Sequence, residues 1–170
     1  MLRKSSILKM VTAALFAAVI LVATAFLFHI HVGQGYIHLG DMFIYLGACF
    51  LPMPYAMLAA GVGAGLADLL TGHVAWVLPT VIIKAASVPA FSNKGKLFSK
   101  RHVLAVVLGG VICVVGYYFA EVILYGSWVA PLIGIPMNIL QATANGAGFL
   151  IVGYAMDRLR LRDQINRLYQ

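Results

Sequence analysis

Long apolar segments, separated by short polar stretches, are the feature of this chain that most restricts its fold. Of its 170 residues, 62% are hydrophobic and only 10% are charged, whereas soluble domains carry about 25% charged residues. A soluble protein of this length has too little interior to bury so much apolar surface, but a lipid bilayer is itself an apolar solvent. Long uniform apolar runs also favour helices over a membrane barrel. The sequence therefore predicts an all-α integral membrane protein with a single domain, 1–170.

The apolar segments predict a bundle of six transmembrane helices. The first segment is longer than the apolar core of a signal peptide, which is about 7–15 residues, so we interpret it as a retained helix. The second is too short to cross a bilayer at about 1.5 Å per residue. Either this helix continues back through the preceding loop, 30–40, or that loop dips into the membrane. The predicted spans are about 7–29, 41–51, 54–71, 75–91, 103–125 and 135–156.

Positive charge is concentrated between the apolar segments. Of the twelve Lys and Arg residues, eleven fall in three clusters, at 3–9, 94–101 and 158–167. Six crossings place all three clusters on the same side, and the positive-inside rule makes that side cytoplasmic. We therefore expect both termini in the cytoplasm. No basic stripe is interleaved with aromatic residues as in a nucleic-acid-binding module, so no nucleic-acid partner is expected.

Polar residues within the apolar segments gather in the half nearer to the predicted outer face. Such residues are costly in a membrane and usually serve a function. Three of them, Asn138, Gln141 and Asn145, are spaced i, i+3, i+7 and share one helical face. Amides and carboxylates in a pocket open to the outside would hydrogen-bond a polar heterocycle, and aromatic rings would stack on it. The predicted substrate-binding residues are Tyr36, His38, Asp41, Asp68, Trp76, Lys84, Glu121, Asn138, Gln141 and Asn145.

The charged residues of this set also have structural interpretations. Lys84 either binds a substrate oxygen or anion, or pairs with Asp68 or Glu121 inside the bundle, or does both. Asp41 either lines the pocket or only caps the N-terminus of its helix. The sequence leaves these alternatives open.

The uncharged residues are open to the same choice. His38 is either a ligand contact or a solvated loop residue, and Trp76 either stacks on a ligand or anchors the chain at the membrane interface. Three amides on one face of a membrane helix need partners. Those partners are either a ligand, which we favour, or groups on neighbouring helices.

No motif indicates a catalytic or ATP-hydrolysing centre. The chain lacks the patterns GxxxxGK[ST], HExxH and GxSxG, so we expect neither an enzyme nor a cofactor. The spacing of His38, Asp41, Asp68 and His73 does not support a metal site. An intramembrane enzyme would need its carboxylates and histidines to converge on a reactive centre, and a purely structural protein would tolerate apolar replacements of the three amides.

The first apolar segment carries two pairs of small residues, Ala13 with Ala17 and Ala14 with Ala18. Small residues four positions apart let another helix approach closely. The other helix belongs either to the same bundle or to a partner subunit, and the spacing does not decide between them.

Three stretches of the chain carry a family resemblance: GYIHLGDMFIYLGACFLP at 35–52, AAGVGAGLADLLTGHVAWVLPTVIIKA at 59–85 and PMNILQATANGAG at 136–148. Together with the chain length, the six spans and the basic start, they resemble the substrate-binding S components of energy-coupling factor (ECF) vitamin transporters. The resemblance implies high-affinity capture of a vitamin from outside. It also implies transport together with a membrane T component and two ABC-type ATPases, in the bacterial cytoplasmic membrane.

The same resemblance assigns roles to two regions. It implies that the first helix contacts the T component through Ala13, Ala14, Ala17 and Ala18. It also implies that the loop 30–40, which contains Tyr36 and His38, acts as a lid over the ligand.

The subgroup that the chain resembles includes S components for riboflavin, hydroxymethylpyrimidine and vitamin B6. The short polar outer half of the bundle suits a compact ring, so we favour vitamin B6 (pyridoxine, pyridoxal or pyridoxamine) or hydroxymethylpyrimidine. The alternatives are another vitamin such as riboflavin, or a role as a stand-alone facilitator of a small solute.

Overall fold

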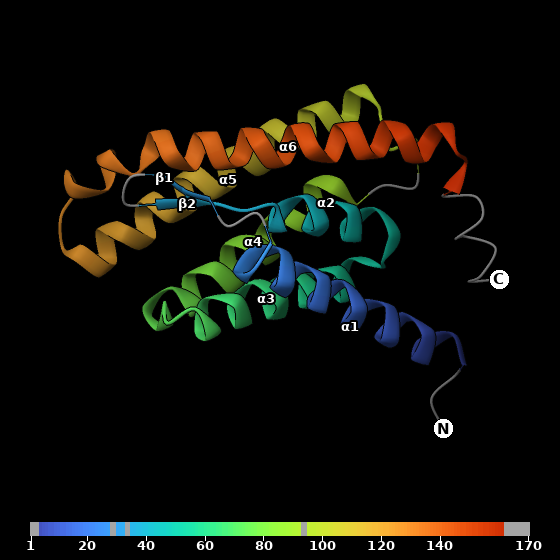
Figure 1. The fold of residues 1–170 in the computed structure, drawn as a ribbon, viewed down its shortest axis with the longest axis horizontal. Helices are drawn as coiled ribbons and strands as arrows, with labels where there is room; N and C mark the ends of the chain where they lie inside the picture. The colour runs from blue at the N-terminus through green and yellow to red at the C-terminus, as the bar shows by residue number, and fades with distance from the viewer. Residues whose placement is uncertain (1–3, 28–29, 33–34, 93–94, 162–170) are drawn as a thin grey trace.

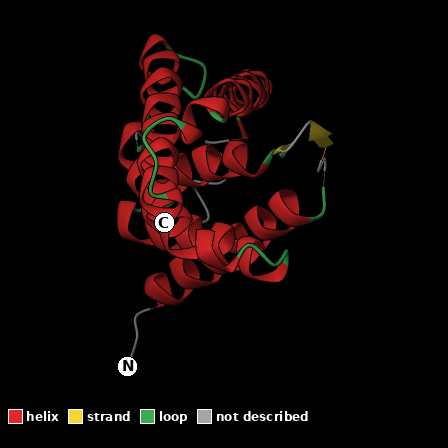
Figure 2. Cartoon of the chain, turned by 90° about the vertical axis from the view of Figure 1, so that its left-hand side faces the viewer, coloured by secondary structure: helices red, strands yellow, loops and turns green. Residues whose placement is uncertain are grey.

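The computed structural model describes residues 4–27, 30–32, 35–92 and 95–161, and within these ranges it is helical apart from one short hairpin and the connecting loops (Figures 1 and 2). The helices are α1 (Lys4–Ala25), α2 (Gly40–Phe50), α3 (Met53–Leu70), α4 (Val77–Phe91), α5 (Lys100–Tyr125) and α6 (Ile135–Arg158). The hairpin consists of β1 (Ile30–Val32) and β2 (Gly35–Ile37), which pair antiparallel. Short 3-10 turns, η1 (Val74–Trp76) and η2 (Ala130–Ile133), precede α4 and α6.

Five of the six described helices are long and apolar enough to cross a membrane. Their positions agree with the predicted spans to within a few residues, except at the end of the first. α1 ends at Ala25 rather than at 29. Phe26 and Leu27 are still apolar, but they lie beyond the helix, on the way to the hairpin that begins at Ile30. α6 extends to Arg158, beyond the predicted limit of 156. The remaining residues, 162–170, lie outside the described part of the chain.

The short helix α2 has 11 residues, and most of them are buried. It does not continue back through the loop 30–40, because that part of the chain forms the hairpin. α2 instead begins at Gly40, next to the C-terminal end of α1. A Cβ atom at Gly40 would overlap the Thr24 hydroxyl of α1, so the absence of a side chain there lets the two segments pass each other closely.

Glycines of α3 bring two other helices close to it, as small residues do in membrane bundles. A Cβ atom at Gly63 would lie 2.6 Å from the backbone oxygen of Ala17 in α1. A Cβ atom at Gly65 would lie 2.6 Å from a methyl group of Val81 in α4. The glycine- and alanine-rich sequence of α3 therefore places it between α1 and α4.

Aromatic packing joins α2 to α4, and one carboxylate joins the α4–α5 loop to α6. Tyr45 of α2 stacks on Phe91 of α4, with ring centroids 3.9 Å apart. Asp157 of α6 accepts hydrogen bonds from the backbone N–H groups of Leu97 and Phe98, at 3.1 and 2.8 Å. The two hydrogen bonds to Asp157 hold the α4–α5 loop against α6.

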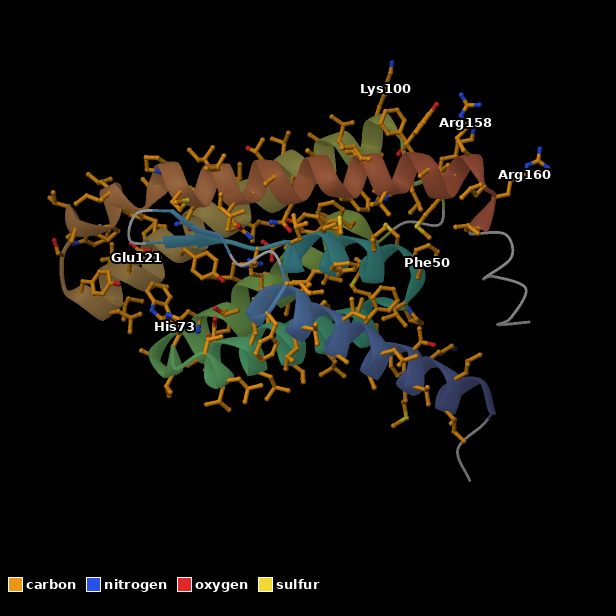
Figure 3. All side chains as sticks on the ribbon, viewed as in Figure 1. Phe50, His73, Lys100, Glu121, Arg158 and Arg160 are labelled. Carbon is orange, nitrogen blue, oxygen red and sulfur yellow. The ribbon has the colours of Figure 1, made fainter. Side chains whose placement is uncertain are left out.

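The two ends of the bundle differ in charge (Figure 3). Lys100, Arg158 and Arg160 lie at the end where α1 begins and α6 ends, whereas His73 and Glu121 lie at the end that carries the hairpin. This separation follows the charge pattern of the sequence. The six crossings and the cytoplasmic location of the basic end remain predictions.

Candidate functional site

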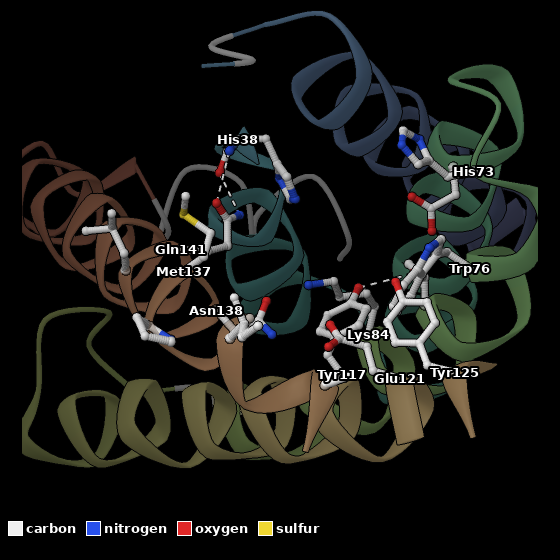
Figure 4. A pocket seen from close by; sticks show the side chains of 17 residues that line it. His38, His73, Trp76, Lys84, Tyr117, Glu121, Tyr125, Met137, Asn138 and Gln141 are labelled. Atoms are coloured by element: carbon white, nitrogen blue, oxygen red, sulfur yellow. Dashed lines mark hydrogen bonds between the residues drawn. The ribbon is translucent and has the colours of Figure 1, made fainter. Parts of the chain in front are cut away.

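A cavity of about 1050 Å³ lies at the end of the bundle that carries His73 and Glu121 (Figure 4). Ligand pockets in proteins commonly enclose about 300–1,000 Å³, so this cavity is large enough for a small organic molecule. His73, Trp76, Lys84 and Tyr117 lie on one side of it. The lining residues are His38, Asp68, His73, Trp76, Thr80, Lys84, Tyr117, Glu121, Tyr125, Ala130, Ile133, Gly134, Pro136, Met137, Asn138, Leu140 and Gln141.

Most of the predicted binding residues line this one cavity, although they come from different helices. Those that line it are His38, Asp68, Trp76, Lys84, Glu121, Asn138 and Gln141. Asp41 and Asn145 are buried next to it but do not line it. Tyr36 belongs to β2, and its side chain lies outside the described part of the chain.

Lys84 lines the cavity with its charge already paired. Its Nζ lies 2.8 Å from each carboxylate oxygen of Asp41, and the two residues are only 3% and 2% exposed. The partner is therefore neither Asp68 nor Glu121, because the first turn of α2 places Asp41 directly beside the lysine. The N-cap position of α2 is Leu39, and Asp41 lies in the first turn of the helix. The ammonium also lies 5.1 Å from the ring centroid of Tyr117, at a distance typical of cation–π contacts.

Two amides of α6 bind the backbone of the segment that leads into α2. Gln141 accepts a hydrogen bond from the His38 N–H (3.0 Å) and donates one to the His38 oxygen (2.9 Å). Asn145 donates to the same oxygen (2.8 Å) and accepts from the Met42 N–H (2.9 Å). Asn145 thus supplies an acceptor for one of the N-terminal N–H groups of a helix that lacks its own side-chain cap. The third amide of the stripe, Asn138, lines the cavity.

One wall of the cavity is aromatic. The rings of Trp76 and Tyr117 have centroids 6.0 Å apart, and those of Trp76 and Tyr125 are 6.4 Å apart. The Tyr117 hydroxyl lies 3.1 Å from the Thr80 hydroxyl. Flat apolar surfaces with hydroxyl groups at their edges suit a heteroaromatic ligand. Thr80 was not among the predicted residues, because a single threonine in an apolar helix gives no signal in the sequence.

Two carboxyl groups face the cavity in different surroundings. Asp68 of α3 is only 5% exposed, and its Oδ2 atom has no hydrogen-bond partner among the described residues. Glu121 of α5 is half-buried and lies beside Gly134. Within the described ranges, no three His, Cys, Asp or Glu side chains gather closely enough to hold a metal ion.

The small-residue pairs of α1 face different neighbours. Ala13 and Ala17 are half-buried and pack against the core of the bundle. Ala14 and Ala18 are exposed, next to the exposed Leu15. One pair therefore serves contacts within the bundle, and the other pair is left on its outer surface.

Fold and site together define a multi-pass membrane protein with a ligand-sized cavity at one end of its bundle. A family model described as "ECF-type riboflavin transporter, S component" matches residues 4–158. The chain belongs to this family, which confirms the resemblance found in the sequence. The description of this family names a component of a membrane transporter, and the long apolar helices of this chain agree with a membrane protein.

One curated protein is also similar to the chain. It is named "Uncharacterized protein in gap 3'region", comes from Pyrococcus woesei, and is 39% identical over 70 residues. The match covers 40% of this chain and 47% of that protein, so the chain matches about half the length of this relative. Its name states no activity.

Proposed function

We propose that this chain captures a small water-soluble vitamin in the cavity at the hairpin end of the bundle. The observation that carries the proposal is the convergence there of an aromatic wall with amide, carboxyl and hydroxyl groups from separate helices. The cavity lies at the end opposite the basic residues, so the positive-inside rule makes it face the outside. In this arrangement the chain crosses the cytoplasmic membrane six times, with both termini in the cytoplasm.

The ligand we favour is a compact heteroaromatic ring, either a form of vitamin B6 or hydroxymethylpyrimidine. Trp76 and Tyr117 would stack on the ring, and Asn138 would hydrogen-bond a ring substituent. Riboflavin is the second candidate, because the description of the matching family names it. The cavity volume accommodates either class, so the choice between them rests on the polar groups and needs a direct test.

The test is a binding assay on the purified chain in detergent. Co-purified small molecules are first identified by mass spectrometry, and the stripped protein is then titrated with pyridoxine, pyridoxamine, hydroxymethylpyrimidine and riboflavin. We expect one of them to bind with nanomolar affinity, on the order of −12 kcal/mol. Absence of both a co-purified vitamin and binding across the panel would contradict the proposed function.

We further assign the 30–37 hairpin the role of a lid, as the family resemblance implies. Gln141 and Asn145 fix the segment at residues 38–42 to α6, so a lid movement would be confined to the hairpin before that attachment. A hairpin with the same mobility in the empty and the vitamin-bound protein would count against this role.

Transport would require partners, because the chain has no ATPase motif of its own. The family implies a membrane T component and two ABC-type ATPases. We assign the exposed face of Ala14 and Ala18 to contact with the T component, since their neighbours Ala13 and Ala17 are already used inside the bundle.

Replacing Ala14 and Ala18 together by leucine is expected to reduce vitamin uptake while leaving vitamin binding by the isolated chain unchanged. Two bulky side chains would prevent close helix approach, and a loss of roughly tenfold in uptake corresponds to about 1.4 kcal/mol of association energy. Uptake by cells that express the complete transporter and binding by the purified chain are measured in parallel. Ala147→Leu, at an exposed alanine of α6, is the matched control. Equal uptake by the double variant and the control would exclude this face as the docking surface.

A further inference from the structure

We propose that Asp68 selects a ligand that carries a hydrogen-bond-donating amino group, and that this aspartate is the specificity-determining residue of the cavity. The inference rests on the proposed function, because it assumes that the cavity is the vitamin site. It adds the chemical class of the substituent that the site recognises.

The position of Asp68 is the first observation. The side chain lines the cavity but is only 5% exposed, and Oδ2 accepts no hydrogen bond from any described residue. A buried carboxyl oxygen without a donor costs free energy, because it has lost water and gained nothing in return. The most direct way to recover this cost is a donor on the ligand that occupies the cavity.

The second observation concerns Lys84, the lysine that lines the same cavity. Its ammonium lies 2.8 Å from both oxygens of Asp41, so its charge is balanced by a residue behind the cavity wall. The half-buried Glu121 adds a further carboxyl group to the lining. Because Asp41 already balances the charge of Lys84, this lysine does not balance the two carboxyl groups of the lining, Asp68 and Glu121.

Two histidines also belong to the lining. His38 accepts a hydrogen bond at Nδ1 from the Gly40 N–H, at 3.1 Å. His73 is exposed and lies within electrostatic range of Asp68. An alkyl amine on a ligand is protonated at about pH 8.

The aromatic wall favours the same class of ligand. Trp76 and Tyr117 line the cavity together with Asp68, and the faces of such rings attract ammonium groups. A ligand with a phosphate group would instead meet carboxyl groups and aromatic faces. The site therefore suits an aminomethyl pyridine or an aminopyrimidine, and it disfavours phosphorylated forms of the same rings.

The experiment compares two ligands that differ in one substituent, pyridoxamine and pyridoxine, by titration calorimetry at about pH 8 on the full chain in detergent. Wild-type protein is expected to bind pyridoxamine more tightly by about 10- to 100-fold, the range of one charge-assisted hydrogen bond. Asp68→Asn is expected to remove this preference, and to change the affinity for pyridoxine by less than about threefold. Hydroxymethylpyrimidine, which carries an amino group on its ring, is expected to lose affinity in the same variant.

Glu121→Gln is the matched control, because it removes a carboxyl group from the same cavity at a half-buried position. We expect it to keep the preference for the amine, which separates a specific contact at Asp68 from the general negative charge of the lining. Equal binding of the two ligands by wild-type protein, or equal weakening of both by Asp68→Asn, would overturn the inference. The wild-type comparison decides even if Asp68→Asn fails to fold.

The same panel distinguishes failure of this inference from failure of the proposed function. Tight binding of riboflavin alone, without binding of either amino compound, would overturn the role of Asp68 and leave the capture function intact. Absence of binding by wild-type protein to any vitamin would instead contradict the capture function itself.

Discussion

Asp41→Asn is expected to lower the stability of the folded chain more than any other single change in the cavity region. The substitution removes the carboxylate that lies 2.8 Å from Lys84 and leaves a buried ammonium group without its counter-charge. Breaking a buried ion pair from one side costs about 3–5 kcal/mol. The measurement is thermal unfolding of the purified chain in detergent, where we expect a clearly lower Tm.

The double variant Asp41→Asn/Lys84→Met supplies the second half of this experiment. It removes both charges, so it is expected to be more stable than Asp41→Asn alone, because no uncompensated charge remains inside. Glu121→Gln, which changes a half-buried carboxyl group, is expected to shift stability by no more than about 0.5 kcal/mol. If Asp41→Asn behaved like Glu121→Gln, the pair would have to be hydrated rather than buried.

The second large effect is expected at Asn145, and it contrasts with that at Asn138 on the same helix face. Asn145→Leu leaves the Met42 N–H without an acceptor and removes one of two donors to the His38 oxygen. Each buried group left unsatisfied costs about 1–3 kcal/mol, so we expect a loss of about 2–4 kcal/mol in unfolding free energy, together with weaker vitamin binding. Denaturant titration in detergent measures the first effect, and calorimetry the second.

Asn138→Leu is the matched substitution at the other end of the stripe. Its side chain lines the cavity and is only half-buried, so stability should remain within about 0.5 kcal/mol of wild type. The proposed ligand contact predicts weaker vitamin binding by the intact fold. Unchanged vitamin affinity would remove Asn138 from the site, and a stability loss equal to that of Asn145→Leu would mean that both amides are structural.

These two asparagines show which properties of the site could be predicted from the sequence. Their spacing predicted a common face and a need for partners, and that much depends only on helical periodicity. The partners themselves depend on which chain segment lies opposite each turn of α6. Asn145 contacts the backbone of His38, which follows the hairpin, and of Met42, in the first turn of α2, both more than 100 residues away along the chain. No local pattern contains that information.

The ion-pair partner of Lys84 likewise depends on which distant segment lies next to it in the bundle. Three carboxylates, at positions 41, 68 and 121, lie at similar predicted depths, and the sequence analysis proposed the second and third. The structure selects the first, because the short helix α2 begins beside α4 and carries Asp41 in its first turn. This pairing also affects the proposed site, because it leaves Asp68 with an oxygen that has no hydrogen-bond partner in the described part of the chain.

The sequence by itself determined the membrane class, the positions of the helices and the separation of the basic clusters from the polar half, because hydropathy and charge act residue by residue along the chain. It also indicated the family, because stretches such as 35–52 and 136–148 carry the resemblance that the family match over residues 4–158 confirms. Only the tertiary structure decided which side of each helix faces the cavity, and which alanine pair of α1 remains exposed. Helix rotation and pairing are set by close packing between distant segments, such as Gly63 against Ala17, and that packing is a property of the assembled bundle.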